Sequence, residues 1–320
     1  MSDRLDIVTV GETLVDLVAP DARHLADATI FQRTAGGAPA NVAVAGARLG
    51  ARTALISAVG RDPFGDYLCQ LLQHEGVDIS ALTLVDQRTT LALVARNAGG
   101  IPDFVFYRGS DTALSPAMVP EELIQRSTFL HASSMALMSE PSRRATLAAL
   151  EIAARNNVLV SVDPNLRPSS WPSLDEARRT VAPLLSSADV LKLNDEEARL
   201  LANTSDLDEA MTALAGKDRL LVVTLGSDGC TWRRGAESGQ LPAPRVQAVE
   251  TTGAGDAFVG ALLAELTGPA AEFGTITAIP ATNLSAAMRF ACVAGALACT
   301  KVGAMTALPA RHDVEQFLLD

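Results

Sequence analysis

The sequence predicts an α/β protein, a three-layer sandwich whose central, mostly parallel sheet lies between two layers of helices. First, short runs rich in Val, Leu and Ile alternate with amphipathic stretches of helical period, as strands buried on both faces do. Second, glycines and polar residues recur where these runs end, which is where open α/β sheets bind their ligands. The expected strands are 5–11, 52–60, 158–163, 190–194 and 219–226, and the expected helices include 38–49 and 62–76.

Two regions interrupt this alternation. Residues 15–34 and 89–107 contain strand-like runs with no helix between them, and Gly99-Gly100 suits the turn of a β-hairpin. We expect one small accessory sheet, discontinuous in sequence, that lies over an edge of the main body as a β lid built from about 12–35 and 88–110. The whole chain, 1–320, is expected to form a single domain, and an exposed lid sheet would be a natural surface for a homodimer.

The bulk composition excludes several classes of protein. Of 320 residues, 48% are hydrophobic and the formal net charge is −11, so the chain can build a core but repels a phosphate backbone. We therefore expect no nucleic-acid partner. The longest apolar region, 290–298, falls short of the roughly 18 residues of a membrane span, so we expect no membrane association. Four cysteines without metal or redox spacing indicate reduced thiols and a cytoplasmic location.

The strongest chemical signal is the run Glu-Thr-Thr-Gly-Ala-Gly-Asp-Ala-Phe at 250–258. Gly253, Ala254 and Gly255 leave the backbone uncovered immediately before a helix expected over 255–266. Backbone N–H groups at a helix start favour a negative charge, which makes this turn a cradle for a phosphoryl group. The Asp256 carboxylate could take a proton from an attacking hydroxyl at the same place. The alternative is that Asp256 only caps the helix.

A second signal lies near the N-terminus. Gly36-Gly37 precedes the helix that contains Pro39 in its first turn, so a ligand can approach the backbone closely and Asn41 can meet hydroxyl groups. Gly11-Glu12 and Asp16 follow the first expected strand, and Asp16 could hold two sugar hydroxyls there. The alternatives are an ordinary loop-to-helix junction and a solvated loop carboxylate.

Three further motifs also follow expected strands. They are Asp-Pro-Asn-Leu-Arg at 163–167, Lys-Leu-Asn-Asp-Glu-Glu at 192–197 and Val-Thr-Leu-Gly-Ser-Asp-Gly at 223–229. Asn194 and Glu197 stand three residues apart, which suits a water-rich magnesium environment, although a capping box at the start of a helix explains the same spacing. The last motif could cover a nucleotide or form only a bend between two strands.

Other active-site patterns are missing from the sequence. The four histidines are scattered without metal-ligand spacing, and there is no Gly-x-x-x-x-Gly-Lys-Ser/Thr loop and no Gly-x-Ser-x-Gly elbow. A nicotinamide oxidoreductase would need Gly-x-Gly-x-x-Gly after the first strand, where this chain has Gly11-Glu12-Thr13.

Taken together, these motifs resemble those of the ribokinase-like carbohydrate kinases, also called the PfkB family. The resemblance covers 11–309 and depends on Gly-Gly-Ala-Pro-Ala-Asn at 36–41 and Thr-Thr-Gly-Ala-Gly-Asp at 251–256. It implies a ribokinase-like sheet-and-helix body with a β lid, an enzyme that transfers phosphate from ATP to a primary hydroxyl of a small sugar, and Mg²⁺ as cofactor.

The resemblance also implies roles for individual residues. Asp256 would be the base, and the Gly253–Asp256 backbone, including Ala254 and Gly255, would form the anion hole. Sugar would bind at Asp16, Gly36, Gly37 and Asn41, and the nucleotide would be lined by Lys192, Asn194, Thr224, Gly226, Gly229 and Asn283. Glu197 would act on Mg²⁺ through water. Glu250 and Thr252 would border a K⁺ site, although the family usually has Asp at the position of Glu250, and the longer side chain could reposition the ion or replace it.

Within the family, the sequence favours fructose as the sugar. Gly-Gly-Ala-Pro-Ala-Asn, the 163–167 motif followed by Trp171-Pro172, and the tail from 299 to 309 are similar to fructokinases. Kinases of 2-keto-3-deoxygluconate share part of the pattern and use arginines to bind a carboxylate, a role that Arg108 and Arg167 could fill. A sugar-binding regulator without catalysis is the alternative from another class.

Overall fold

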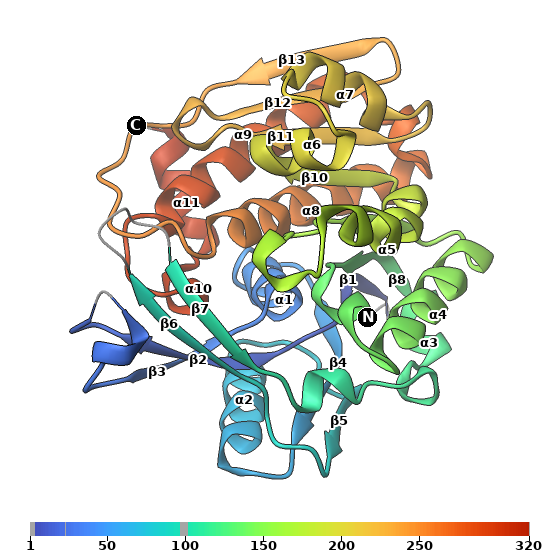
Figure 1. Cartoon of the computed structure of the whole chain (residues 1–320). Coiled ribbons are helices and arrows are strands. Elements are labelled where there is room, and N and C mark those ends of the chain that lie inside the picture. The colour runs from blue at the N-terminus through green and yellow to red at the C-terminus, as the bar shows by residue number, and fades with distance from the viewer. Residues whose placement is uncertain (1–3, 23, 97–101, 320) are drawn as a thin grey trace.

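The computed structural model describes residues 4–22, 24–96 and 102–319. Within these ranges the chain forms a nine-stranded sheet in the order β13-β12-β11-β10-β9-β8-β1-β4-β5, with helices on both faces (Figure 1). Its strands are β1 Leu5–Val10, β4 Thr53–Gly60, β5 Leu82–Val85, β8 Ser127–Ala132, β9 Leu159–Val162, β10 Val190–Asn194, β11 Leu220–Thr224, β12 Cys230–Arg234 and β13 Glu237–Leu241.

All the pairings from β5 to β11 are parallel, and β12 and β13 are added as antiparallel strands at one edge. The order reverses at β1, which pairs with β4 on one side and with β8 on the other. The carboxyl ends of the parallel strands therefore meet along one rim of the sheet, next to this switch point, where a ligand crevice is expected. The five predicted strands are confirmed as β1, β4, β9, β10 and β11.

Strand β8 lies outside the predicted runs. Its sequence, Ser-Thr-Phe-Leu-His-Ala, interrupts the apolar pattern with three polar side chains, yet all six residues are buried. Two of these side chains have partners: His131 Nδ1 lies 3.0 Å from Ser161 Oγ on the neighbouring strand β9, and Ser127 Oγ donates to the Ile124 carbonyl at 2.7 Å. Thr128 Oγ1 and His131 Nε2 are buried without a hydrogen-bond partner among the described residues.

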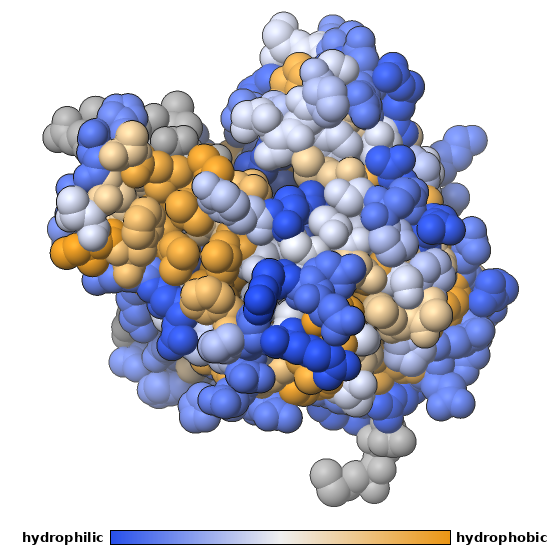
Figure 2. Space-filling view, turned by 60° about the horizontal axis from the view of Figure 1, so that its bottom comes forward, coloured by the Kyte–Doolittle hydropathy of each residue, from blue (hydrophilic) through white to orange (hydrophobic). Residues whose placement is uncertain are grey.

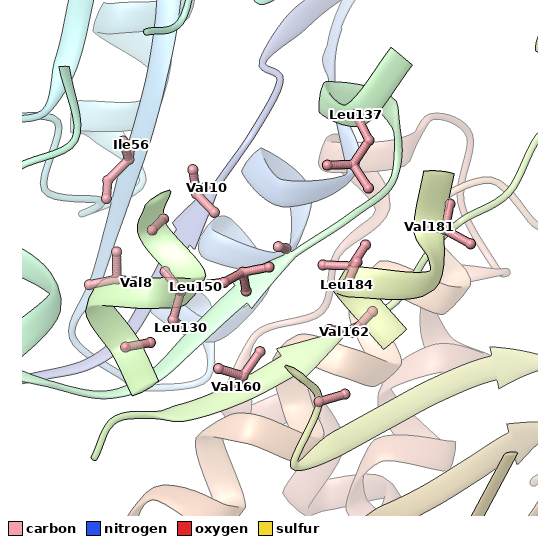
Figure 3. Close-up of a cluster of buried hydrophobic side chains, with 14 of the residues drawn as sticks. Val8, Val10, Ile56, Leu130, Leu137, Leu150, Val160, Val162, Val181 and Leu184 are labelled. Carbon is pink, nitrogen blue, oxygen red and sulfur yellow. The ribbon is translucent and has the colours of Figure 1, made fainter. Parts of the chain in front are cut away.

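The helices form two layers around the sheet. They are α1 Ala38–Arg48, α2 Pro63–His74, α3 Glu121–Gln125, α4 Ser142–Arg155, α5 Leu174–Ser187, α6 Asp195–Ala202, α7 Leu207–Ala215, α8 Ala254–Phe273, α9 Ala281–Ala298, α10 Ala304–Ala307 and α11 Arg311–Leu319. Apolar side chains of the strands meet α4 and α5 on one face, as Figure 3 shows for Leu130, Val160, Leu150 and Leu184. A second cluster on the other face joins the sheet to α8, α9 and α11.

A second, smaller sheet lies beside the main body (Figure 1) and has the order β3-β2-β6-β7. Its strands are β2 Leu14–Ala19, β3 Gln32–Gly36, β6 Leu91–Arg96 and β7 Pro102–Tyr107. This confirms the predicted discontinuous sheet, in which β2 pairs in parallel with the distant β6. A short 3₁₀ turn, Leu25–Asp27, lies between β2 and β3, where no helix was expected. The predicted turn at Gly99-Gly100 lies outside the described residues.

Helix α9 corrects the prediction that no segment approaches the length of a membrane span. Its 18 residues are long and apolar enough to cross a membrane by length and composition alone. Half of that window is buried inside the protein, and α9 packs along α8 in the second apolar cluster. A helix that lies between a sheet and other helices needs apolar residues around most of its circumference.

Candidate active site

The turn before α8 is the candidate anion cradle. Gly253 has φ of 82° and starts the helix, and a Cβ added there would lie 3.0 Å from the backbone of Ala304, so glycine is required. The helix then runs from Ala254 for 20 residues, so its first amides lack partners within the helix and its dipole points at the turn. The structure therefore places Gly253, Ala254 and Gly255 at a helix N-terminus next to Asp256.

Asp256 is buried, with 7% of its surface exposed, in the first turn of α8. Its Oδ2 accepts a hydrogen bond of 2.8 Å from Nδ2 of Asn41 in the first turn of α1. Burial raises the pKa of Asp256 to about 6, with Asp163 adding to the rise, while the Asn41 bond, Lys192 and Arg167 oppose it. Such a carboxylate is ionised near neutral pH and still basic enough to accept a proton. Two residues 215 positions apart are thus brought into direct contact.

The small sheet brings Asp16 to the same place. The pKa of this half-buried carboxyl is raised to about 7, mainly by burial and also by the charges of Asp256 and Glu250. Asp16 lies against Gly36 on the paired strand β3, where an added Cβ would lie 2.1 Å from Asp16 Oδ2. Gly37 has φ of 102°, and a Cβ there would lie 2.6 Å from the carbonyl oxygen of Glu12. Glycine at both positions therefore leaves room for the acid and for the backbone of the lid.

A buried ion pair lies behind the anion cradle. Lys192 Nζ on β10 donates to Asp163 Oδ2 at the end of β9 over 2.8 Å, and both side chains are about 6% exposed. A Cβ added to Gly255 would lie 2.9 Å from Lys192 Nζ, so the ammonium lies directly against the first turn of α8. The charges of Asp163, Glu197 and Asp256 outweigh burial and raise the pKa of Lys192. The positive charge is thereby fixed at the cradle.

Asn194 and Glu197 form a capping box at the start of α6. Asn194 Oδ1 accepts from the Glu197 amide at 2.8 Å, and Glu197 Oε2 accepts from the Asn194 amide at 2.9 Å. The other oxygen of Glu197 accepts from the Leu166 amide at 2.5 Å and so holds the 163–167 segment against α6. The capping box that the spacing of these two residues allowed is therefore formed in the structure. Burial and Asp163 raise the pKa of Glu197.

The remaining candidate nucleotide residues lie at the end of β11, in the turn that follows it and at the start of α9. Thr224 ends β11 and donates to the Leu193 carbonyl at 3.3 Å, and the turn that follows has Gly226 with φ of 58° and Gly229 with φ of 94°. A Cβ on Gly229 would lie 2.0 Å from the Leu241 carbonyl oxygen, so that glycine is needed for the bend into β12. Asn283 lies exposed in the first turn of α9, where Thr282 donates to its amide oxygen.

The two candidate arginines differ in their environment. Arg108, just beyond β7, donates through Nε to Asp111 at 2.5 Å and through Nη2 to the Met135 carbonyl at 3.3 Å. Its charge is therefore compensated by a buried carboxylate. Arg167 is exposed, makes two 3.4 Å contacts with nearby carbonyl oxygens, and lowers the pKa of Asp256 by its charge. Arg167 thus lies within electrostatic reach of the candidate base.

Glu250 closes the loop beside the cradle. Its Oε1 accepts from the Thr252 hydroxyl at 2.9 Å, and its Oε2 accepts from the Gly303 amide at 2.7 Å. Cys299, at the end of α9, accepts the Val249 and Glu250 amides through its carbonyl oxygen at 2.7 and 3.1 Å. The segment before α8 is thereby tied to the segment after α9.

The 163–167 motif by itself indicates no role for Asp163, the partner of Lys192. The sequence likewise indicates no role for Glu12, which is buried just after β1. The sequence does contain a signal for the ion pair: Asp163 and Lys192 have opposite charges and lie near the carboxyl ends of two expected strands. Such charges are expected to meet if the two strands are neighbours. Only the strand order shows that β9 and β10 are adjacent.

The model of the pfkB family of carbohydrate kinases matches residues 4–311. The chain belongs to this family. Fructokinase-2 of Solanum habrochaites is 40% identical over 309 residues, which cover 95% of this chain and 93% of the relative. Relatives of this kind extend across both the body and the small sheet, so the family assignment applies to the whole fold.

Solved structures of pfkB-type kinases have the same fold. A fructokinase variant from Vibrio cholerae O395, in a form with fructose, ADP and potassium ion bound, has a TM-score of 0.87 and 35% identity, with 99% of this chain and 100% of that chain covered. A putative ribokinase II from E. coli, in complex with ATP and Mg²⁺, has a TM-score of 0.85 and 27% identity, with 98% of both chains covered. This pfkB chain therefore has the ribokinase-like architecture.

Proposed function

We propose that the protein is a fructokinase that transfers the γ-phosphoryl group of ATP to a primary hydroxyl of fructose. The observation that carries the proposal is the contact between Asn41 and Asp256, which joins a candidate sugar residue to a candidate base at a helix N-terminus. Membership of a carbohydrate kinase family and 40% identity to a fructokinase support the reaction and the sugar. In this reading Asp16, Gly36, Gly37 and Asn41 hold the sugar.

The residues divide the chemistry between them. Asp256 accepts the proton of the attacking hydroxyl, and Asn41 holds its carboxylate in place through the 2.8 Å bond. The amides of Gly253, Ala254 and Gly255, with the Lys192 ammonium behind them, stabilise the negative charge on the transferred group. The small sheet, carrying Asp16, covers the sugar and excludes water that would otherwise accept the phosphoryl group.

The donor set near the cradle fits magnesium that is held mainly by ATP and water. Glu197 and Asn194 offer oxygen atoms, but their capping-box bonds already fix them, so they would orient the ion's water ligands rather than replace them. When bound, Mg²⁺ neutralises charge on the phosphates. Thr224, Gly226, Gly229 and Asn283 line the remainder of the nucleotide in this proposal.

An uncharged sugar fits the lid better than a sugar acid does. Arg108 already pairs with Asp111 and donates to a backbone carbonyl, so a substrate carboxylate would have to compete with a buried carboxylate for it. Above its pKa of about 7, the Asp16 carboxylate also adds negative charge near Asp256 and would repel an acid. Both observations favour fructose over 2-keto-3-deoxygluconate.

Steady-state kinetics test the proposal. ATP-dependent phosphorylation is measured for fructose, 2-keto-3-deoxygluconate, ribose and adenosine, and the product carbon is identified by NMR. We expect kcat/KM for fructose to exceed that for each of the others. A higher value for the sugar acid would reassign the substrate, and sugar binding without any ATP consumption would support a regulator instead.

We propose that Glu250 takes over the work of a monovalent cation at the loop beside the cradle. Both of its carboxylate oxygens already bind the loop, through Thr252 and Gly303, so its charge holds this segment directly. We expect activity to change less than about threefold when K⁺ is replaced by a bulky organic cation, and Glu250→Asp to gain K⁺ dependence because the shorter side chain reaches fewer of these donors. Strong K⁺ activation of the unaltered enzyme would contradict this proposal.

We also propose that the small sheet forms the interface of a homodimer. Figure 2 shows a continuous apolar area over a lobe at the edge of the molecule, and the exposed large apolar side chains of the small sheet include Val105, at 41%, and Tyr107, at 60%, on the edge strand β7. Light scattering should give twice the mass of 33.4 kDa, and Val105→Lys combined with Tyr107→Lys should give a monomer. A monomer at all concentrations before mutation would refute it.

The cysteines support a cytosolic location, which we include in the proposal. The Cys230 and Cys292 sulfur atoms lie 3.6 Å apart in the core without a disulfide, and Cys69 and Cys299 are free as well.

A further inference from the structure

Glu12 is a buried carboxyl at the junction between the main body and the small sheet. It lies in the short segment between β1 and β2, after Gly11, and only 4% of its surface is exposed. The proposed chemistry gives it no part, since Asp256 and Asp16 carry the roles of base and sugar ligand. A carboxylate this deeply buried needs compensating contacts, and those contacts indicate what it does.

The contacts of Glu12 converge on the loop proposed to bind sugar. Its Oε1 accepts a hydrogen bond of 3.2 Å from the amide of Ala38, the first residue of α1. Its backbone oxygen lies so near Gly37 that a Cβ there would approach it to 2.6 Å. The neighbouring Gly11 packs in the same way, because a Cβ on it would lie 2.7 Å from the Pro39 ring. The side chain and the backbone of residues 11–12 therefore both pack against the loop of residues 36–39.

The second carboxylate oxygen joins Glu12 to the main body. Ser133 Oγ, just after β8, lies 3.5 Å from Oε2. The charges that act on Glu12 come from Arg108 and Asp111, which form an ion pair at the end of β7. Burial is the main cause that raises the pKa of Glu12 to about 7, and Asp111 adds to it while Arg108 opposes it. The segment after β1, the start of α1 and the segment after β8 thus meet at one carboxyl group, within electrostatic reach of the Arg108–Asp111 pair.

We infer that Glu12 is a positioning residue for the sugar site: by holding the Ala38 amide, its side chain fixes Gly36-Gly37 and aligns Asn41 with Asp256. Asn41 lies one turn after Ala38 on the same helix, so a displaced helix start would move the amide that contacts the base. The inference rests on the proposed function, because it takes 36–41 as part of the sugar site. In this role Glu12 makes no contact with the nucleotide.

Three variants test this role against a purely structural one. Glu12→Ala removes the acceptor and leaves the Ala38 amide buried without a partner. Glu12→Gln keeps an acceptor oxygen of the same reach. Asp189→Ala is the matched control: Asp189 Oδ2 likewise accepts a backbone amide, that of Val160 at 2.7 Å, but at the amino ends of β9 and β10, away from the cradle. KM for fructose, KM for ATP and kcat are measured for each variant, together with amide hydrogen exchange of the segment 36–44.

We expect Glu12→Ala to raise KM for fructose roughly tenfold or more while KM for ATP changes less than about threefold, and to speed exchange in 36–44 about tenfold. Glu12→Gln should keep KM for fructose and the exchange rate in 36–44 close to those of the unaltered protein. Asp189→Ala should change neither KM for fructose nor that exchange rate. If Glu12→Ala does not fold, Glu12→Asp is used, because it withdraws the carboxylate by one methylene. This variant should raise KM for fructose more than KM for ATP, to a smaller extent than expected for Glu12→Ala.

Unchanged exchange in 36–44, or equal increases in both KM values, would overturn the role of Glu12. A protein that phosphorylates none of the sugars would instead refute the proposed function, and the exchange measurement would still decide whether Glu12 holds the loop.

Discussion

Asp256→Asn should lower turnover at least about a hundredfold while sugar binding is kept, because a positioned general base contributes on the order of 10² to 10⁴ in rate. The amide is isosteric and can still accept from Asn41, so the sugar site stays intact. In the unaltered enzyme, kcat/KM should fall as the pH drops through about 6, where Asp256 becomes protonated. Assays of product formation measure turnover, and calorimetry separately measures the binding of fructose to the variant.

The same substitution should stabilise the protein without ligand at pH 8. Burial raises the pKa of Asp256 from 3.8 to about 6, so the folded state binds the proton more tightly and stability falls as the pH rises across this interval. Removing the charge should recover roughly 2 to 3 kcal/mol at pH 8, measured by denaturant unfolding. Asp206→Asn, at the exposed N-cap of α7, is a control that should change neither property. Near-normal turnover of Asp256→Asn would remove it from the role of base.

Lys192→Met should both inactivate and destabilise the enzyme. It removes the ammonium that lies against Gly255 and leaves the carboxylate of Asp163 buried without its 2.8 Å partner, a change that typically costs about 3 to 5 kcal/mol. Since Lys192 opposes the rise in the pKa of Asp256, its loss should also move the acid limb of the pH–rate profile to higher pH. Turnover should drop at least about a hundredfold through lost charge stabilisation at the cradle.

A double variant separates the two effects of Lys192. Lys192→Met with Asp163→Asn removes both charges, so unfolding measurements should show most of the stability recovered. Turnover should stay low, because the cradle still lacks its positive charge. If turnover returned together with stability, the ion pair would be structural only.

The contacts of this site explain which sequence inferences succeeded. Runs rich in Val, Leu and Ile predict β1 and β10 because strands buried on both faces must be apolar. Strand β8 escapes notice because Ser, Thr and His interrupt its apolar run, and the Ser161 partner of His131 is known only once β9 lies beside it. Asp256 and the glycines around it are predictable because a local motif, a small-residue turn before a helix, already contains the chemistry.

Residues whose roles depend on distant partners could not be placed from the sequence. Asn194 and Glu197 are three residues apart, a spacing that favours a capping box but also allows a magnesium site, and the hydrogen bonds of the capping box are seen only in the structure. Glu12 and Asp163 become meaningful only through Ala38 and Lys192, which lie 26 and 29 positions away.

The sequence by itself determined the fold class, the discontinuous small sheet and the glycine turn at the start of α8, since hydrophobic period and glycine chemistry act over a few neighbouring residues. Only the tertiary structure decided that Asn41 meets Asp256, that Lys192 is paired with Asp163, and that Glu12 supports the start of α1. These contacts depend on strand order and on the packing of α1 against α8, and both result from burying the whole apolar surface of the chain at once.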